Sequence, residues 1–198
     1  MKRIVFGMLL AFGVALLSYM PPAAAQKFEV RPVAEKKLKE LPPGPLYWTI
    51  ETFPTLAAAQ AAAGPTALAA DVSGTVWLFT LGQRGLSTPG GTKVTEIGPV
   101  PPITATEYLL RINNTGGPPG ARTPQHTHPG SETFYVISGR LGQKTPNGEH
   151  FVDAGKSMNG QGADVPMEVF NSGTTDLNAL VMFVVDAGKP FSSHATIR

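Results

Sequence analysis

Two of the four histidines in this chain, His126 and His128, stand two residues apart, and Glu132 follows four residues after the second. Residues two apart on a β-strand point to the same face, so both imidazoles can converge on one centre. A turn at Pro129 and Gly130 can bring the carboxylate of Glu132 back to that centre. Two neutral imidazoles and a carboxylate suit one divalent transition metal (iron, manganese, nickel, copper or zinc) and leave positions open for water or substrate. Taken alone, the pair is equally compatible with two surface histidines in a loop.

Short strands separated by turns must position these residues. Five segments after Asp71 are rich in β-branched and aromatic residues, and clusters of glycine, proline and asparagine separate them. They are residues 76–81, 107–112, 133–137, 167–171 and 177–185. Strands at such regular spacing indicate an all-β sandwich or barrel.

One of these strands should carry an apolar wall beside the candidate site. Phe134 and Val136 share the parity of Glu132, whereas Tyr135 and Ile137 face the other way. In residues 179–185 the apolar side chains are consecutive, so both faces of that strand must be covered. The opposite sheet would cover one face, and either the N-terminal segment or a second subunit would cover the other.

The segment before the barrel has a different pattern. Residues 46–50 alternate like a short strand, and the alanine-rich residues 56–63 favour a helix with Thr55 as its N-cap. Gly64-Pro65 ends that helix, and a second short turn would run through Ala70. The lysine-rich residues 36–40 suggest a solvated helical turn or a tether.

Composition excludes several classes of protein. The 198 residues suit one domain with a terminal extension. A formal net charge of +2 and a charged fraction of 15% provide no strong field for nucleic acid or an anionic membrane. The chain has no cysteine, which rules out disulfides, zinc–thiolate sites, iron–sulfur clusters and thiol nucleophiles.

The first 25 residues have the pattern of a signal peptide. Lys2 and Arg3 precede an apolar run over residues 4–17, and Ala25 ends a small-residue cleavage site. The alternative is an uncleaved membrane anchor, but the run is shorter than the roughly 18 apolar residues that a span needs. We therefore expect a periplasmic or secreted protein that does not contact the membrane after cleavage.

The spacing of five residues in the centre of the chain matches a known motif. Gly120, His126, His128, Glu132 and Gly139 fit Gly-x5-His-x-His-x3-Glu-x6-Gly at every fixed position. This segment resembles the first motif of the cupin superfamily. The resemblance implies a cupin-type double-stranded β-helix, or jelly-roll barrel, with a metal in its mouth and a small-molecule ligand or substrate. It also implies a homodimer joined through β-strands.

The expected division of the chain follows from these patterns. Residues 1–25 would be the signal peptide, residues 26–70 an N-terminal extension with a short helix, and residues 71–198 the barrel domain.

The second cupin motif is incomplete in this sequence. Between Gly155 and Asn171 there is one extra residue, and Met167 stands where the motif has its metal-binding histidine. Three alternatives remain. The site can keep three ligands and an open position, it can add the Met167 thioether, which favours copper, or the barrel can be an empty binding cavity. Gln161 and Asp164 could add oxygen ligands from the preceding loop.

Three functions are compatible with these features. The first is a metal-dependent enzyme, with an oxidoreductase or dioxygenase favoured, in which Glu132 is a ligand or a catalytic base. The second is a non-catalytic periplasmic protein that binds a metal or a small ligand, and a weaker third is a structural role in the envelope. Other polar residues are expected outside the site: Glu107 and Arg111 as a solvated pair, His150 as exposed, and His194 as isolated in the C-terminal tail.

Overall fold

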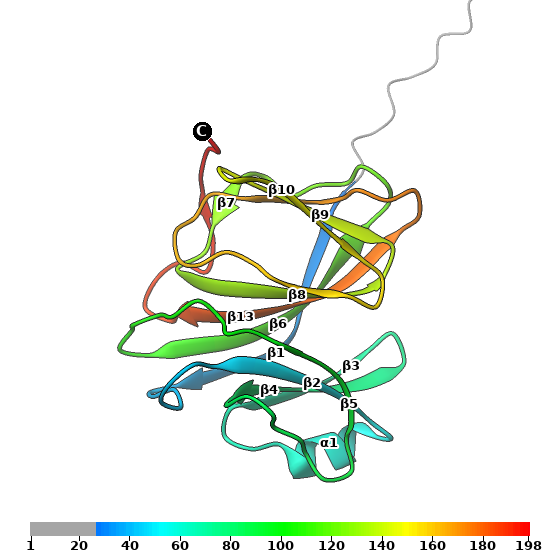
Figure 1. Ribbon diagram of the computed structural model, residues 1–198, viewed down its shortest axis with the longest axis vertical. Coiled ribbons are helices and arrows are strands. Elements are labelled where there is room, and N and C mark those ends of the chain that lie inside the picture. The colour runs from blue at the N-terminus through cyan, green and yellow to red at the C-terminus, as the bar shows by residue number, and fades with distance from the viewer. Residues whose placement is uncertain (1–26) are drawn as a thin grey trace, which may run out of the picture.

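A computed structural model of the chain describes residues 27–198, so the predicted signal peptide lies outside the described residues. One short helix and a series of strands make up this part (Figure 1). Their bounds are β1 Glu29–Leu38, β2 Tyr47–Phe53, α1 Leu56–Ala62, β3 Ala67–Val72, β4 Thr75–Gly82, β5 Thr92–Ile97, β6 Tyr108–Gly117, β7 His126–Thr127, β8 Gly130–Ser138, β9 Arg140–Thr145, β10 Gly148–Asp153, β11 Ser157–Asn159, β12 Glu168–Asn171, β13 Leu177–Asp186 and β14 Ser193–His194. Over residues 27–198, no helix is long and apolar enough to cross a membrane.

The strands after β5, together with β1, form a barrel. A five-stranded sheet in the order β1-β6-β13-β8-β11 faces a three-stranded sheet β10-β9-β12, and the pair β14-β7 lies at one end (Figure 1). Every pairing between these strands is antiparallel. The prediction of an all-β jelly-roll barrel of the double-stranded β-helix type is therefore confirmed.

Strand β13 is covered on both faces, as its consecutive apolar residues predict. Ala179, Val181 and Phe183 pack into the barrel, in one hydrophobic cluster with residues of β8, β9 and β12. Leu180 and Met182 alternate with them and belong to a second cluster on the outside of the barrel. The side chains of one strand thus hold two layers together.

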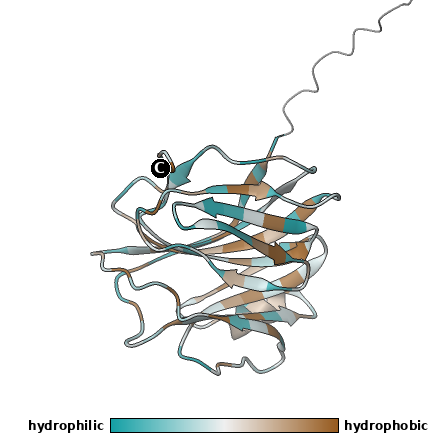
Figure 2. Ribbon diagram, turned by 45° about the horizontal axis from the view of Figure 1, so that its top comes forward, coloured by the Kyte–Doolittle hydropathy of each residue, from teal (hydrophilic) through white to brown (hydrophobic). Residues whose placement is uncertain are grey.

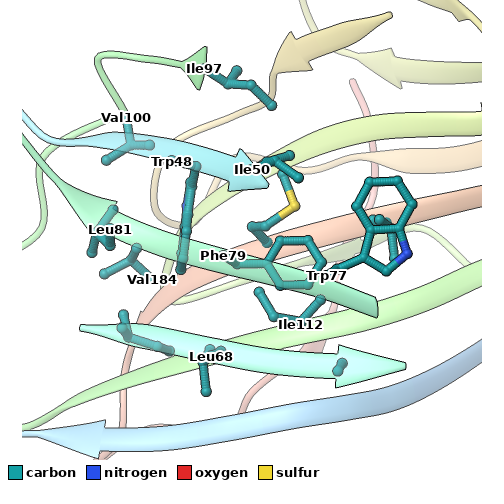
Figure 3. Close-up of a cluster of buried hydrophobic side chains, with 14 of the residues drawn as sticks. Trp48, Ile50, Leu68, Trp77, Phe79, Leu81, Ile97, Val100, Ile112 and Val184 are labelled. Atoms are coloured by element: carbon teal, nitrogen blue, oxygen red, sulfur yellow. The ribbon is translucent and has the colours of Figure 1, made fainter. Parts of the chain in front are cut away.

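A second sheet forms the outer layer. Strands β3, β4, β2 and β5 pair in that order and lie below the barrel in Figure 1, with α1 on their far side. Trp48, Ile50 and Phe79 are fully buried in the shared cluster, where they meet residues of β6 and β13 (Figure 3). The layer that covers this face is built from residues 47–97, so the N-terminal extension expected over residues 26–70 supplies only part of it and residues beyond 70 supply the rest.

Hydropathy follows this layering. In Figure 2 the hydrophobic colour gathers on the strands in the middle of the stack, and the connecting loops are largely hydrophilic or neutral. Alternation within each strand places one set of side chains in the barrel and the other between the sheets.

The expected strands and helix in the outer layer are largely confirmed. Of the strand expected over residues 46–50, residues 47–50 fall on β2. Helix α1 begins after Thr55, whose hydroxyl accepts a hydrogen bond from the amide of Ala58 at 3.1 Å. Residues 65–70 are not a turn, because most of them lie in β3. The boundary expected between residues 70 and 71 therefore falls inside a strand.

The lysine-rich segment is an edge strand rather than a helical turn or tether, which corrects the expectation for residues 36–40. The ammonium of Lys36 donates to the carbonyl of Ala67 at 2.9 Å, and Lys37 and Lys39 contact Glu107 at 3.1 and 2.8 Å. These partners are distant in sequence, so local composition could not reveal them. Glu107 is consequently paired with lysines and not with Arg111.

If the two layers unfold together, a cavity in the outer layer should weaken the whole molecule. We expect Phe79→Ala to lower the free energy of unfolding by about 3–5 kcal/mol, because the ring is fully buried between the sheets. Urea unfolding should be followed by tryptophan fluorescence, since Trp48 and Trp77 both lie in the outer sheet, and by circular dichroism of all strands.

The matched control is Val94→Ala on edge strand β5, where the side chain is 36% exposed and the expected change is below about 0.5 kcal/mol. Two separated transitions, with fluorescence preceding circular dichroism, would contradict a single cooperative unit.

Candidate functional site

The two histidines of the motif lie together at one end of the barrel. The centroids of the His126 and His128 rings are 4.9 Å apart, and the rings meet edge to face. Nδ1 of His126 lies 2.8 Å from the carbonyl oxygen of Pro124, and Nδ1 of His128 lies 2.7 Å from that of Phe191. A carbonyl oxygen only accepts, so each Nδ1 carries the proton and each Nε2 keeps a free lone pair.

Burial keeps both imidazoles neutral. Desolvation lowers the pKa of His126 and lowers the pKa of His128 to about 4, against the weaker opposing effect of the carbonyl bonds. The ring of His128 also packs against Phe183 and Phe191, each with its centroid 4.8 Å away. A neutral imidazole held by a hydrogen bond at Nδ1 is the form that binds a metal through Nε2.

Glu132 lies on β8 and is buried in the barrel. Its side-chain oxygen Oε1 accepts a hydrogen bond from the side-chain amide of Gln143 on β9. Burial raises the pKa of Glu132 to about 8, so its carboxyl group is largely protonated at neutral pH. Phe134 is buried beside it, and Val136 belongs to the same barrel cluster, which confirms the predicted apolar wall.

Gln143 connects Glu132 to the residue of the incomplete second motif. Its amide nitrogen also lies 3.6 Å from the sulfur of Met167, which is fully buried, and its amide oxygen accepts from Gln161 at 3.4 Å. Met167 therefore lies next to the Glu132 network, and whether it binds a metal stays a prediction. Asp164 is exposed and contacts the site only through its backbone amide, which donates to the carbonyl of His128 at 2.8 Å.

The donors fit a metal ion only in part. Within residues 27–198, no three side chains of histidine, aspartate or glutamate are gathered closely enough to hold one. The two imidazoles present free Nε2 atoms, whereas Glu132 is engaged by Gln143 in the described arrangement. The expected three-ligand set is therefore not assembled here, and the part that fits is His126 and His128.

A cavity of about 430 Å³ opens beside these residues. His126, His128 and Glu132 all line it. Most of the remaining surface is apolar, and the polar exceptions include Arg111 and Asn113 on β6. The arrangement can therefore hold a small molecule next to the imidazoles.

The C-terminal segment forms one side of this cavity. Strand β14 pairs with β7 and places the Cα atom of His194 opposite that of His126. Phe191, just before β14, supplies both the carbonyl and the ring that hold His128. The expectation that His194 is isolated in a tail is wrong, because the tail folds back onto the strand that carries the first histidine. His150 is exposed on β10, as expected.

Arg111 is another residue that the sequence placed wrongly. Its guanidinium lies 3.0 Å from Glu35 rather than beside Glu107, and it sits 4.2 Å over the ring of Phe191. Gln143 and Phe191 were not identified from the sequence at all. Their position is set by strand pairing across the barrel. For Arg111, the only signal in the sequence for its inward direction was the alternation of residues 109, 111 and 113 on β6.

Residues 117–185 match the family model described as a cupin domain. This match begins near the end of β6, ends within β13, and contains His126, His128, Glu132 and Met167. This part of the chain, residues 117–185, is therefore identified as a cupin domain. No curated protein matches it.

Several solved structures are similar to part of this chain. A cupin superfamily protein from Desulfitobacterium hafniense is 10% identical over 39% of this chain and 68% of that one, with a TM-score of 0.36. The DMSP lyase DddQ from Ruegeria pomeroyi is 17% identical over 43% of each chain, with a TM-score of 0.38. An oxalate oxidase in complex with the substrate analogue glycolate is 22% identical over 43% of this chain and 46% of that one, with a TM-score of 0.37. The chain thus spans less than half the length of these two enzymes.

A single glycine lets the loop after β11 approach Glu132. A Cβ atom at Gly160 would lie 2.8 Å from Cγ of Glu132 and 2.9 Å from the Phe134 ring. We expect Gly160→Ala to lower the free energy of unfolding by about 1–3 kcal/mol through overpacking, measured by urea denaturation. Gly64→Ala is the control, because a Cβ there meets no atom within 4 Å. Equal stability of the two variants would show that the loop does not pack on Glu132 as described.

Proposed function

We propose that this protein is a metal-binding cupin that holds a small molecule in its barrel beside a divalent transition metal, with His126 and His128 as ligands. One observation carries the proposal. Both Nδ1 atoms are bound to backbone carbonyls, at 2.8 and 2.7 Å, which leaves the Nε2 atom of each ring free. The two imidazoles are 4.9 Å apart. Histidines that bind a metal need a hydrogen-bond partner that fixes their tautomer, and both of these have one.

The chain's own residues would divide the remaining work. The apolar wall would exclude water from the bound molecule, and Glu132, which lines the same cavity, would be a third ligand or would hold a proton near the reacting atoms. For Glu132 to become a ligand, its hydrogen bond with Gln143 would have to rearrange. When bound, the metal would supply Lewis acidity. If the metal is redox-active, it would also supply oxygen chemistry, and the reaction we favour in that case is that of an oxidoreductase or dioxygenase.

A non-catalytic binding protein is the second candidate function. It is favoured by the engagement of Glu132 with Gln143 and by the burial of Met167 at the position of the second-motif histidine. Both features leave fewer groups for catalysis. Oxygen uptake by the iron- or copper-loaded protein with small organic substrates would distinguish the two functions. We also propose that the protein is exported, with cleavage after Ala25, and that it forms a homodimer.

Metal content tests the proposed site. Mature protein purified without chelators or a metal-binding tag should contain about one transition metal per chain, measured by elemental analysis. The double variant His126→Ala/His128→Ala should lose it, because no other imidazole pair is arranged in this way within residues 27–198.

Two controls make that result specific. His150→Ala removes an exposed histidine and should keep the metal. Thermal unfolding of the double variant shows whether the barrel still folds, and loss of metal from a folded variant supports the site. Stoichiometric metal in the folded double variant would place the site elsewhere. Copper that is lost in Met167→Leu would add the thioether to the ligand set.

A further inference from the structure

We infer that the cavity binds a small apolar molecule with one carboxylate group, and that Arg111 holds this carboxylate. The inference rests on the proposed function in that it names the class of ligand for the same cavity. It concerns a different wall, because Arg111 lies on β6 whereas the imidazoles lie at β7.

Arg111 presents a largely buried guanidinium to the cavity. Its side chain is 18% exposed, and it is the only lysine or arginine among the residues that line this cavity. On β6 it alternates with Leu110 and Ile112, which pack on the other side against the outer sheet. Strand alternation therefore directs the guanidinium toward the barrel interior.

The orientation of the guanidinium is fixed from two sides. Phe191 lies 4.2 Å beneath its central carbon, which is cation–π geometry. Nε donates to the side-chain oxygen of Asn113 at 3.0 Å and lies 3.0 Å from Glu35. Within residues 27–198, the two terminal nitrogens have no hydrogen-bond partner, so up to four N–H donors are available to a ligand.

Charge and shape together select a carboxylate. A planar guanidinium fork matches the two oxygens of a carboxylate, and such charge-assisted bonds are roughly twice as strong as neutral ones. Glu35 offsets part of the positive charge, but it is 46% exposed and outside the set of cavity residues. One cation in a cavity with Phe134, Val181 and Phe183 in its wall suits a monoanion with an apolar body, not a polyanion or a sugar.

Benzoate and benzamide are suitable probes, because they share size and shape and differ in charge. Calorimetric titration of the chelator-treated full mature chain should show benzoate binding at least about tenfold more tightly than benzamide. Arg111→Gln should abolish this preference, and Glu35→Gln should strengthen benzoate binding several-fold by removing the competing carboxylate. Arg84→Gln, which removes an exposed arginine of the loop between β4 and β5, is the matched control and should leave the preference unchanged.

Circular dichroism and thermal unfolding confirm that each variant is folded. If Arg111→Gln fails to fold, the opposite effect expected for Glu35→Gln still tests the inference. Equal binding of benzoate and benzamide by the wild-type chain would overturn it, as would a folded Arg111→Gln variant that keeps the preference.

Repeating the titration on zinc-loaded protein separates this inference from the proposed function. Arg111-dependent benzoate binding in a protein that takes up no zinc would support the carboxylate site and reject the metal site. Zinc binding that needs both histidines, without a benzoate preference, would reject only the carboxylate site. Benzoate binding that requires zinc and ignores Arg111→Gln would mean that the metal takes the carboxylate, which also overturns the inference.

Discussion

Strand β13 is buried on both faces, and its packing joins the barrel to the outer sheet. Val181 and Phe183 point into the barrel, while Leu180 and Met182 point toward the outer sheet. Because side chains alternate along a strand, a shift of one residue would exchange these two sets. Neither set would then face the layer that it packs against. The register of β6 and β8 is therefore fixed on both edges of β13, and with it the inward direction of Arg111 and Glu132.

The cavity places polar groups in a low-dielectric interior, where each needs a partner or a neutral form. The imidazoles of His126 and His128 stay neutral and donate to backbone carbonyls, and Glu132 accepts from Gln143. The same bonds that offset the cost of burial also set which atoms remain free. For the imidazoles these are the two Nε2 lone pairs, and for Arg111 they are the terminal nitrogens. Stability and binding chemistry thus depend on one set of hydrogen bonds.

Local patterns in the sequence were sufficient for the fold class, the principal strands and the pairing of the two histidines. The alternation of side chains and the turn residues indicate contacts within one strand or one turn. Gly139, at φ +79 between β8 and β9, is such a turn residue. The site residues that were missed depend on distant partners. Phe191 supports His128 across 63 residues of chain, and Arg111 meets Glu35 through the pairing of β1 with β6. Such contacts arise from sheet topology, which no single segment encodes.

Counting the imidazoles around a bound metal tests whether His126 and His128 form the proposed site. X-ray absorption fine structure of the zinc-loaded protein distinguishes imidazole from oxygen ligands by the scattering of the ring's outer atoms. We predict two imidazoles, coordinated through Nε2 of His126 and His128, with oxygen ligands completing the shell. A spectrum with no imidazole scattering, or with a single imidazole, would contradict it.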